Sequence, residues 1–186
     1  MRRKVKNKMK KISVISLMLV LAMCVAVFSG CAKKEETEAP DGMKLASGEK
    51  VDYYMYVPET WKVDNSELYT AAYFSSGDAT SISATAYGIS AEITTVDAWW
   101  TLFEEEMAGV YSNISEIAKA DAKIDGIDGK EFTFSATLGD QEYNFIITAV
   151  IRDYYVYYIT YTSIPEYNED HLEERTQVID AFRFKD

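Results

Sequence analysis

The residue with the clearest chemical potential in this sequence is Cys31, a thiol that directly follows two small residues, Ser29 and Gly30. A thiolate is a nucleophile and a metal ligand, and its reactivity depends on its surroundings. The only other cysteine, Cys24, lies inside an apolar run that extends from residue 12 to residue 28. Cys31 stands just beyond the end of that run, and this position predicts attachment of lipid to its sulfur.

The residues before Cys31 have the composition of a secretory signal peptide. Seven Lys and Arg residues precede the apolar run, and such a basic start favours the cytoplasmic side of a membrane. Phe28, Ser29, Gly30 and Cys31 resemble the bacterial lipobox, with Phe28 at a position where Leu is usual. The resemblance implies that a diacylglycerol is joined to the Cys31 thiol and that the chain is cleaved before it. An uncleaved anchor is the alternative, since about 17 to 25 apolar residues can span a bilayer.

Lipidation at Cys31 would determine where the protein resides and which chemistry it lacks. Two or more acyl chains on one residue anchor a protein stably, whereas a single chain does so only marginally. We therefore expect attachment to the cell membrane, on its extracytoplasmic face. Cys24 would leave with residues 1–30, so the exported chain would have no thiol for a disulfide, a metal or nucleophilic catalysis. We expect no metal and no cofactor.

The net charge limits the partners of the protein. The chain has 19 basic and 30 acidic residues, a net charge of -11. Residues 1–30 contain seven basic residues and no acidic ones, so the exported form has 12 basic and 30 acidic residues, net -18. Binding to nucleic acid or anionic lipid relies on Lys and Arg, and this balance argues against both. The acidity is interpreted as a solvated surface.

Two other groups of residues could carry chemistry, but their spacing favours a structural role. His171 is the only histidine, and the sequence indicates no carboxylate fixed beside it, so we expect no Ser-His-Asp triad. Four aspartates could supply oxygen ligands for calcium, but they lack the alternation of an EF-hand: Asp121, Asp125, Asp128 and Asp140. Asp125-Gly126 and Asp128-Gly129 are predicted to form turns.

The sequence divides into three predicted parts. Residues 1–30 form the signal peptide. Residues 31–50 contain the lipidated N-terminus and a disordered linker, because they offer little to bury and include Pro40-Asp41-Gly42. Residues 51–186 form a single domain of common size.

Alternation of apolar residues predicts a β-rich domain. The last three predicted strands are separated only by short breaks at Gly139-Asp140 and Arg152-Asp153, which favours an antiparallel meander. The six predicted strands cover residues 51–57, 68–74, 81–87, 131–138, 142–151 and 154–162.

Two helices complete the predicted domain. Thr94 and Asp97 have the spacing of a capping box, and apolar residues at helical intervals follow them. Trp99 and Trp100 are interpreted as core residues, because successive helical residues diverge by about 100° and cannot both lie in one ligand plane. A second helix is predicted over residues 163–182, with a proline in its first turn.

The last predicted strand contains the candidate binding residues Tyr155, Tyr157 and Tyr161. The side chains that would point to one face of this strand and those that would point to the other are both apolar. This pattern indicates either a sheet covered on both faces or a sheet with an exposed tyrosine groove. Tyrosine also suits half-buried positions at which its hydroxyl reaches water. Both interpretations are open from the sequence.

The order of elements resembles the PsbP/Mog1/DcrB-like superfamily over about residues 51–186. The resemblance is carried by residues 57–61 (VPETW), by the start of the long meander at residues 129–132 (GKEF) and by residues 179–184 (IDAFRF). It implies an α+β fold in which an antiparallel meander packs with two main helices. It implies no active-site motif. A cystatin-like or NTF2-like sheet is the alternative architecture.

Two functional classes follow from these observations. The first is a membrane-anchored, non-enzymatic domain that binds an envelope protein or glycan. The second is a cell-wall hydrolase, which would need two carboxylates about 5 to 9 Å apart in a concave pocket. The sequence favours the first.

Overall fold

The computed structural model describes residues 38–65 and 69–185. The predicted signal peptide and the lipobox-like residues 28–31 lie outside this part of the chain. No helix among the described residues is long and apolar enough to cross a membrane.

The helices are α2 (Val96–Ala108), α3 (Leu172–Ala181) and a short 3-10 helix, η1 (Pro165–Tyr167). The strands are β1 (Met43–Leu45), β2 (Tyr53–Tyr54), β3 (Tyr56–Pro58), β4 (Lys62–Asn65), β5 (Tyr69–Tyr73), β6 (Ser81–Gly88), β7 (Ala118–Ile124), β8 (Ile127–Leu138), β9 (Gln141–Arg152), β10 (Tyr155–Ser163) and β11 (Arg183–Phe184).

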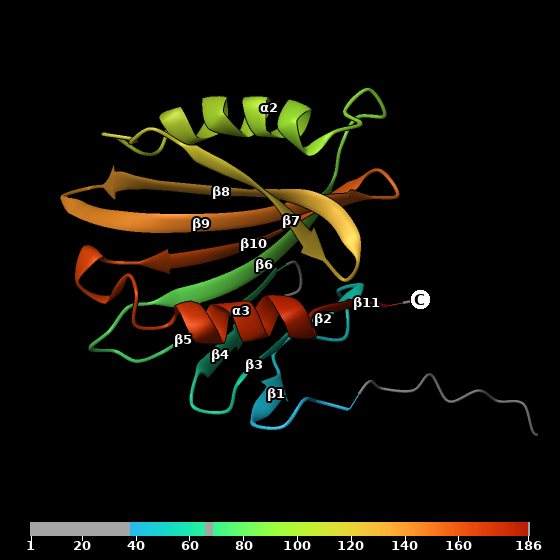
Figure 1. Cartoon of the computed structure of the whole chain (residues 1–186), viewed down its shortest axis with the longest axis vertical. Helices are drawn as coiled ribbons and strands as arrows, with labels where there is room; N and C mark the ends of the chain where they lie inside the picture. The colour runs from blue at the N-terminus through green and yellow to red at the C-terminus, as the bar shows by residue number, and fades with distance from the viewer. Residues whose placement is uncertain (1–37, 66–68, 186) are drawn as a thin grey trace, which may run out of the picture. The chain divides into compact units, whose positions relative to one another are not determined.

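A seven-stranded antiparallel sheet forms the centre of the domain, in the order β4-β5-β6-β10-β9-β8-β7 (Figure 1). The predicted meander is confirmed as the consecutive pairs β8–β9 and β9–β10. β10 also pairs with β6, so it lies in the interior of the sheet with a hydrogen-bonded neighbour on each side. The α+β fold class predicted from the sequence is confirmed.

Both faces of the sheet are covered, and this explains the doubly apolar pattern of β10. Residues 157, 159 and 161 lie in one core cluster together with residues of α3. Val156 belongs to a second cluster, together with Trp99 and Trp100 of α2, and Tyr158 packs against it. Figure 1 shows α2 above β8 and α3 below β6. Since successive side chains of a strand point to opposite faces, a strand between two helices is apolar at nearly every position.

Helix α2 begins one residue later than predicted. Its N-cap is Thr95, whose side chain accepts a hydrogen bond from the backbone N–H of Ala98 at 3.2 Å. Thr94 and Asp97 therefore do not form the expected box. The core assignment of the two tryptophans is confirmed, because Trp99 is 2% exposed and Trp100 is fully buried.

The two ends of the predicted domain need correction. The linker predicted over residues 31–50 extends too far, because Met43–Leu45 pairs with β3 and the compact unit begins at Ala39. Backbone pairing with a strand from the folded part orders this segment despite its polar composition. The single helix predicted over 163–182 is divided into η1 and α3 by a turn.

The predicted turns are correct at two places, shifted at one and wrong at one. The break predicted at Arg152-Asp153 is a turn at Asp153-Tyr154, because Arg152 still pairs with Tyr155 at the end of β9. Asp125-Gly126 forms the two-residue β7–β8 turn with positive φ at both residues, and Gly139 has φ 62° in the β8–β9 turn. Asp128-Gly129 instead lies inside β8. A β-carbon at residue 129 would lie only 2.0 Å from the Ala149 carbonyl oxygen, so this glycine permits close approach of two backbones.

Candidate functional site

The structure separates the three candidate tyrosines of β10. Tyr155 is 48% exposed, whereas Tyr157 is 4% exposed and Tyr161 is fully buried. Of the two interpretations that the sequence left open, the covered sheet is correct for Tyr157 and Tyr161, so these two candidate binding residues are not accessible and only Tyr155 is. Their side chains face the core beneath α3, and only the end of the strand emerges from the cover of the helix.

The exposed end of β10 forms a small aromatic surface, which we call the tyrosine tip and define as Tyr154, Tyr155 and Gly88. Tyr155 is paired with Gly88 of β6, and a β-carbon at Gly88 would lie 3.9 Å from the Tyr155 ring. The ring therefore lies over a position without a side chain. Tyr154 is 67% exposed, and its carbonyl accepts a hydrogen bond from the backbone N–H of Ile89 at 2.9 Å.

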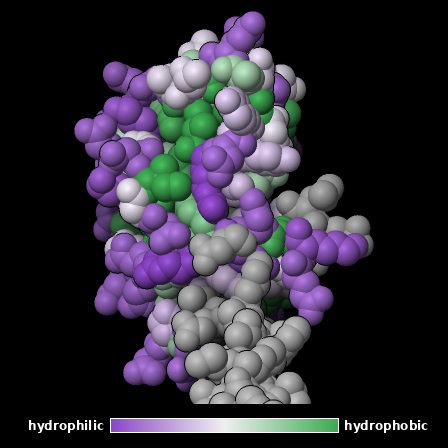
Figure 2. Space-filling model, turned by 90° about the vertical axis from the view of Figure 1, so that its right-hand side faces the viewer, coloured by the Kyte–Doolittle hydropathy of each residue, from purple (hydrophilic) through white to green (hydrophobic). Residues whose placement is uncertain are grey.

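The tyrosine tip lies at the end of the domain that is on the right in Figure 1 and faces the viewer in Figure 2. Figure 2 shows hydrophobic surface at this end as a strip bordered by hydrophilic residues. Such a surface presents apolar and polar groups side by side. A tyrosine ring combines an apolar face with a hydrogen-bonding hydroxyl.

Tyr157, which lies next to the tyrosine tip on β10, makes several contacts within the domain. The Tyr157 hydroxyl donates a hydrogen bond to the Asp52 carboxylate. Burial and this carboxylate raise the pKa of Tyr157 above its ordinary value, so the hydroxyl remains a donor at physiological pH. Phe184 packs edge-on against Tyr157 with ring centroids 4.8 Å apart, and the guanidinium of Arg152 lies 4.8 Å from the centre of the Phe184 ring. The ring centroids of Tyr155 and Tyr157 lie 6.3 Å apart, so the tip adjoins an ordered base formed by Tyr157 and Phe184.

Tyr161 belongs to a different cluster, which surrounds His171. His171 is 7% exposed, and its Nε2 lies 3.0 Å from Asp78 while its Nδ1 lies 3.2 Å from Glu174. The expectation that no carboxylate is fixed beside His171 is therefore wrong. Asp78 comes from the β5–β6 connection, 93 residues earlier in the chain, and the sequence alone offers no signal for this pairing.

The charges of this cluster indicate a structural role. Burial opposes ionisation of Asp78, but hydrogen bonds from Thr80 and His171 outweigh it and lower the pKa of the carboxyl. Burial also raises the pKa of Tyr161 to about 12. Because each ring nitrogen of His171 faces a carboxylate, neither nitrogen is left to accept a proton from a serine. The cluster joins α3 to the β5–β6 connection.

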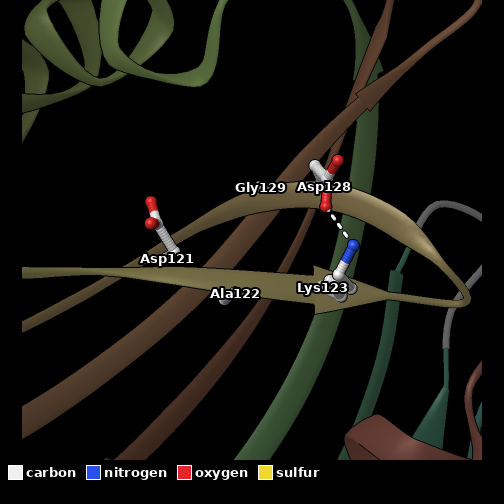
Figure 3. Close-up of a pocket in the computed structure, with 5 residues that line it drawn as sticks. All are labelled: Asp121, Ala122, Lys123, Asp128 and Gly129. Atoms are coloured by element: carbon white, nitrogen blue, oxygen red, sulfur yellow. Dashed lines mark hydrogen bonds and ion pairs between the residues drawn. The ribbon is translucent and has the colours of Figure 1, made fainter.

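A hollow of about 530 Å³ on the β7–β8 hairpin tests the hydrolase hypothesis (Figure 3). It is lined by Asp121, Ala122, Lys123, Asp128 and Gly129. Asp128 forms an ion pair with Lys123, and Asp121 lies 2.7 Å from the ammonium of Lys130. This hydrogen-bonded ammonium lowers the pKa of Asp121. The pKa of a general acid in glycoside hydrolysis is raised, whereas that of Asp121 is lowered, so Asp121 does not have the property that this role requires.

Comparisons with known proteins identify the fold. No family model matches the chain, and no curated protein matches it. Among solved structures, cyanobacterial PsbP from Synechocystis aligns with a TM-score of 0.56 and 11% identity, over 77% of this chain and 92% of that one. LpqN of Mycobacterium tuberculosis, which is involved in cell envelope biogenesis, aligns with a TM-score of 0.55 and 10% identity, over 72% and 83%. The yeast Ran-binding protein Mog1p aligns with a TM-score of 0.53 and 10% identity, over 77% and 96%.

These likenesses confirm the PsbP/Mog1-like fold that the resemblance implied. The aligned proteins differ in what their descriptions say they do, and a shared fold does not determine function. The function of this chain must therefore be argued from its own residues.

Proposed function

We propose that this protein is a lipid-anchored, non-enzymatic binding domain on the extracytoplasmic face of the cell membrane. Its N-terminal residues support the anchor, because a basic start, an apolar run and the residues Phe28 to Cys31 occur in the order that lipid attachment requires. The structural similarity to an envelope-biogenesis protein agrees with this location. The binding partner is an envelope protein or glycan.

The observation that carries the binding function is the exposure of Tyr155. Folding buries the other two candidate tyrosines of β10 and leaves this ring half exposed over Gly88, on the ordered base formed by Tyr157 and Phe184. Large, rigid and amphipathic side chains give much contact area for little loss of conformational entropy. An exposed tyrosine on an ordered base is therefore well suited to contact a partner.

The anchor is tested by replacing the proposed lipid attachment site. We expect Cys31→Ser to abolish incorporation of a radiolabelled or clickable fatty acid and to release the protein from the membrane fraction, because no acyl chain is left to hold it. Cys24→Ser is the matched control and should retain both label and location. If Cys31→Ser stays in the membrane fraction, the apolar run itself is the anchor.

The binding function is tested in intact cells with the full-length protein and a membrane-impermeant amine crosslinker. We expect the wild-type protein to form a discrete crosslinked complex and Tyr155→Ala to reduce its yield at least fivefold, because the central contact surface is removed. Leu102→Ala, which changes a 48% exposed side chain on α2, should leave the yield unchanged. The absence of any complex of the wild-type protein would contradict binding to an envelope protein.

A further inference from the structure

The backbone at Tyr154 is in a conformation that tyrosine disfavours. Asp153 and Tyr154 have φ values of 51° and 65° and connect β9 directly to β10. A two-residue hairpin loop with positive φ at both positions is a type I′ turn, which prefers Asn-Gly or Asp-Gly. Positive φ crowds the β-carbon of a side chain, and it is an outlier for a bulky residue.

The same protein contains a type I′ turn with the preferred residues, and it serves as an internal comparison. The β7–β8 connection is Asp125-Gly126, with φ values of 48° and 78°. The two turns share the first aspartate and the same backbone region and differ in the second residue. Glycine at residue 154 would therefore satisfy the β9–β10 turn with less strain.

Packing of the Tyr154 side chain within the domain does not compensate for the strained backbone. Its side chain is 67% exposed, the highest exposure among the large apolar and aromatic side chains that the structure leaves accessible. The β9–β10 register runs without interruption from the Arg152–Tyr155 pair onward, so the turn needs no ring at residue 154. A strained residue that contributes little to folding indicates a role outside the folded domain.

The chemistry and shape of the turn indicate a protein partner. Tyr154 and Tyr155 are adjacent and exposed, and tyrosine is among the residue types enriched at energetic centres of protein interfaces. A tight turn presents its side chains outward and does not enclose a small ligand. The partner must therefore supply the concave surface, and a folded protein with a pocket for the Tyr154 ring fits this requirement better than an extended glycan.

The charge of the chain indicates the sign of the partner surface. The exported form carries a net charge of -18. In the turn itself the Asp153 carboxylate forms an ion pair with Arg152 at 3.5 Å, so the sign of the partner surface follows from the net charge of the chain. Complementary charge accelerates association and orients the partners, and salt weakens it. The surface around the receiving pocket is therefore basic.

We infer that Tyr154 is an anchor residue that inserts into a pocket on a basic surface of an envelope protein, and that its strained turn is kept for this contact. The inference rests on the proposed binding function and names the class of its partner. Tyr155 lies beside the anchor and completes the contact. Tyrosine at this position thus lowers the free energy of unfolding and provides a contact for the partner.

The first experiment identifies what contacts residue 154. A photo-crosslinking phenylalanine is incorporated at position 154 of the full-length lipidated protein in intact cells. In a second strain it is incorporated at the exposed control position, Leu102. We expect a protein adduct at position 154 that is absent at position 102, and mass spectrometry should identify a protein with a basic surface. An adduct with glycan alone, or equal adducts at both positions, would overturn the inference.

The second experiment measures affinity and stability with the full-length protein in detergent and the purified adduct protein. We expect Tyr154→Gly to weaken binding at least tenfold while raising the melting temperature, and Tyr154→Asn, which also tolerates positive φ, to weaken binding similarly. Binding of the wild-type protein should weaken as salt rises. Unchanged affinity, or a melting temperature lowered by Tyr154→Gly, would overturn the inference.

The outcomes separate this inference from the proposed function. If the wild-type protein forms no complex in cells, binding itself fails. If the wild-type complex forms and Tyr155→Ala disrupts it while Tyr154→Gly retains it, the domain binds a partner but Tyr154 is not its anchor.

Discussion

Replacing Trp100 with alanine is expected to cost about 3–5 kcal/mol of the free energy of unfolding, the usual range for a buried aromatic residue. Trp100 is fully buried and stacks on Phe132 with ring centroids 3.6 Å apart and planes 3° from parallel. Since a domain has roughly 5–15 kcal/mol in total, this loss is a large fraction of the stability of the domain. Urea denaturation followed by fluorescence or circular dichroism measures the loss.

The physical cause of this loss is packing. The ring N–H of Trp100 has no hydrogen-bond partner among the described residues, so its removal breaks no hydrogen bond there. Leu102→Ala is the matched control, because it truncates a 48% exposed side chain two residues later on α2, and it should change stability by less than about 0.5 kcal/mol. A cost below about 1.5 kcal/mol for Trp100→Ala would contradict the placement of α2 against the sheet.

Replacing Gly129 with alanine is expected to cost about 3 kcal/mol, at the upper end of the range for overpacked sites. The added carbon would lie 2.0 Å from the Ala149 carbonyl oxygen and 2.7 Å from a methyl carbon of Val150. A backbone oxygen cannot rotate away as the end of a side chain can, so β8 and β9 would have to separate locally. The midpoint of urea denaturation should fall, and amide exchange should become faster on both strands.

Gly77→Ala is the matched control for this prediction. Gly77 has no neighbouring atom within 4 Å of an added β-carbon and has no positive φ, so the substitution should leave stability nearly unchanged. Equal effects of the two substitutions would show that β8 and β9 do not approach each other at Gly129 as the structure describes.

Local patterns were reliable where neighbouring residues decide the structure. The long meander follows from alternation and from Gly139-Asp140, because a strand period and a turn preference are properties of a few consecutive residues. Helix α2 follows from apolar residues at helical spacing. The error of one residue at its N-terminus arose because Thr94 and Thr95 are both suitable caps, and backbone geometry decides between them.

The candidate site was less predictable, because its accessibility depends on distant segments. Tyr155 and Tyr157 are the same residue type on the same strand, and α3 and β11 decide that only Tyr155 is exposed. Asp128-Gly129 resembles a turn in sequence, but the approach of β9 makes it a strand position. His171 contacts Asp78, which lies 93 residues earlier in the chain. No local sequence pattern predicts a contact at that separation.

The sequence by itself determined the charge of the chain, the lipobox-like N-terminus, the strand and helix periodicities and thus the class of fold, because each of these depends on residue type and short spacing. Only the tertiary structure decided which tyrosines are accessible, that His171 lies between two carboxylates, and that Tyr154 occupies a strained turn while remaining exposed. Burial arises from contacts between segments far apart in the chain, and the strain at Tyr154 arises from the pairing of β9 with β10 that fixes its turn. Both exist only after folding.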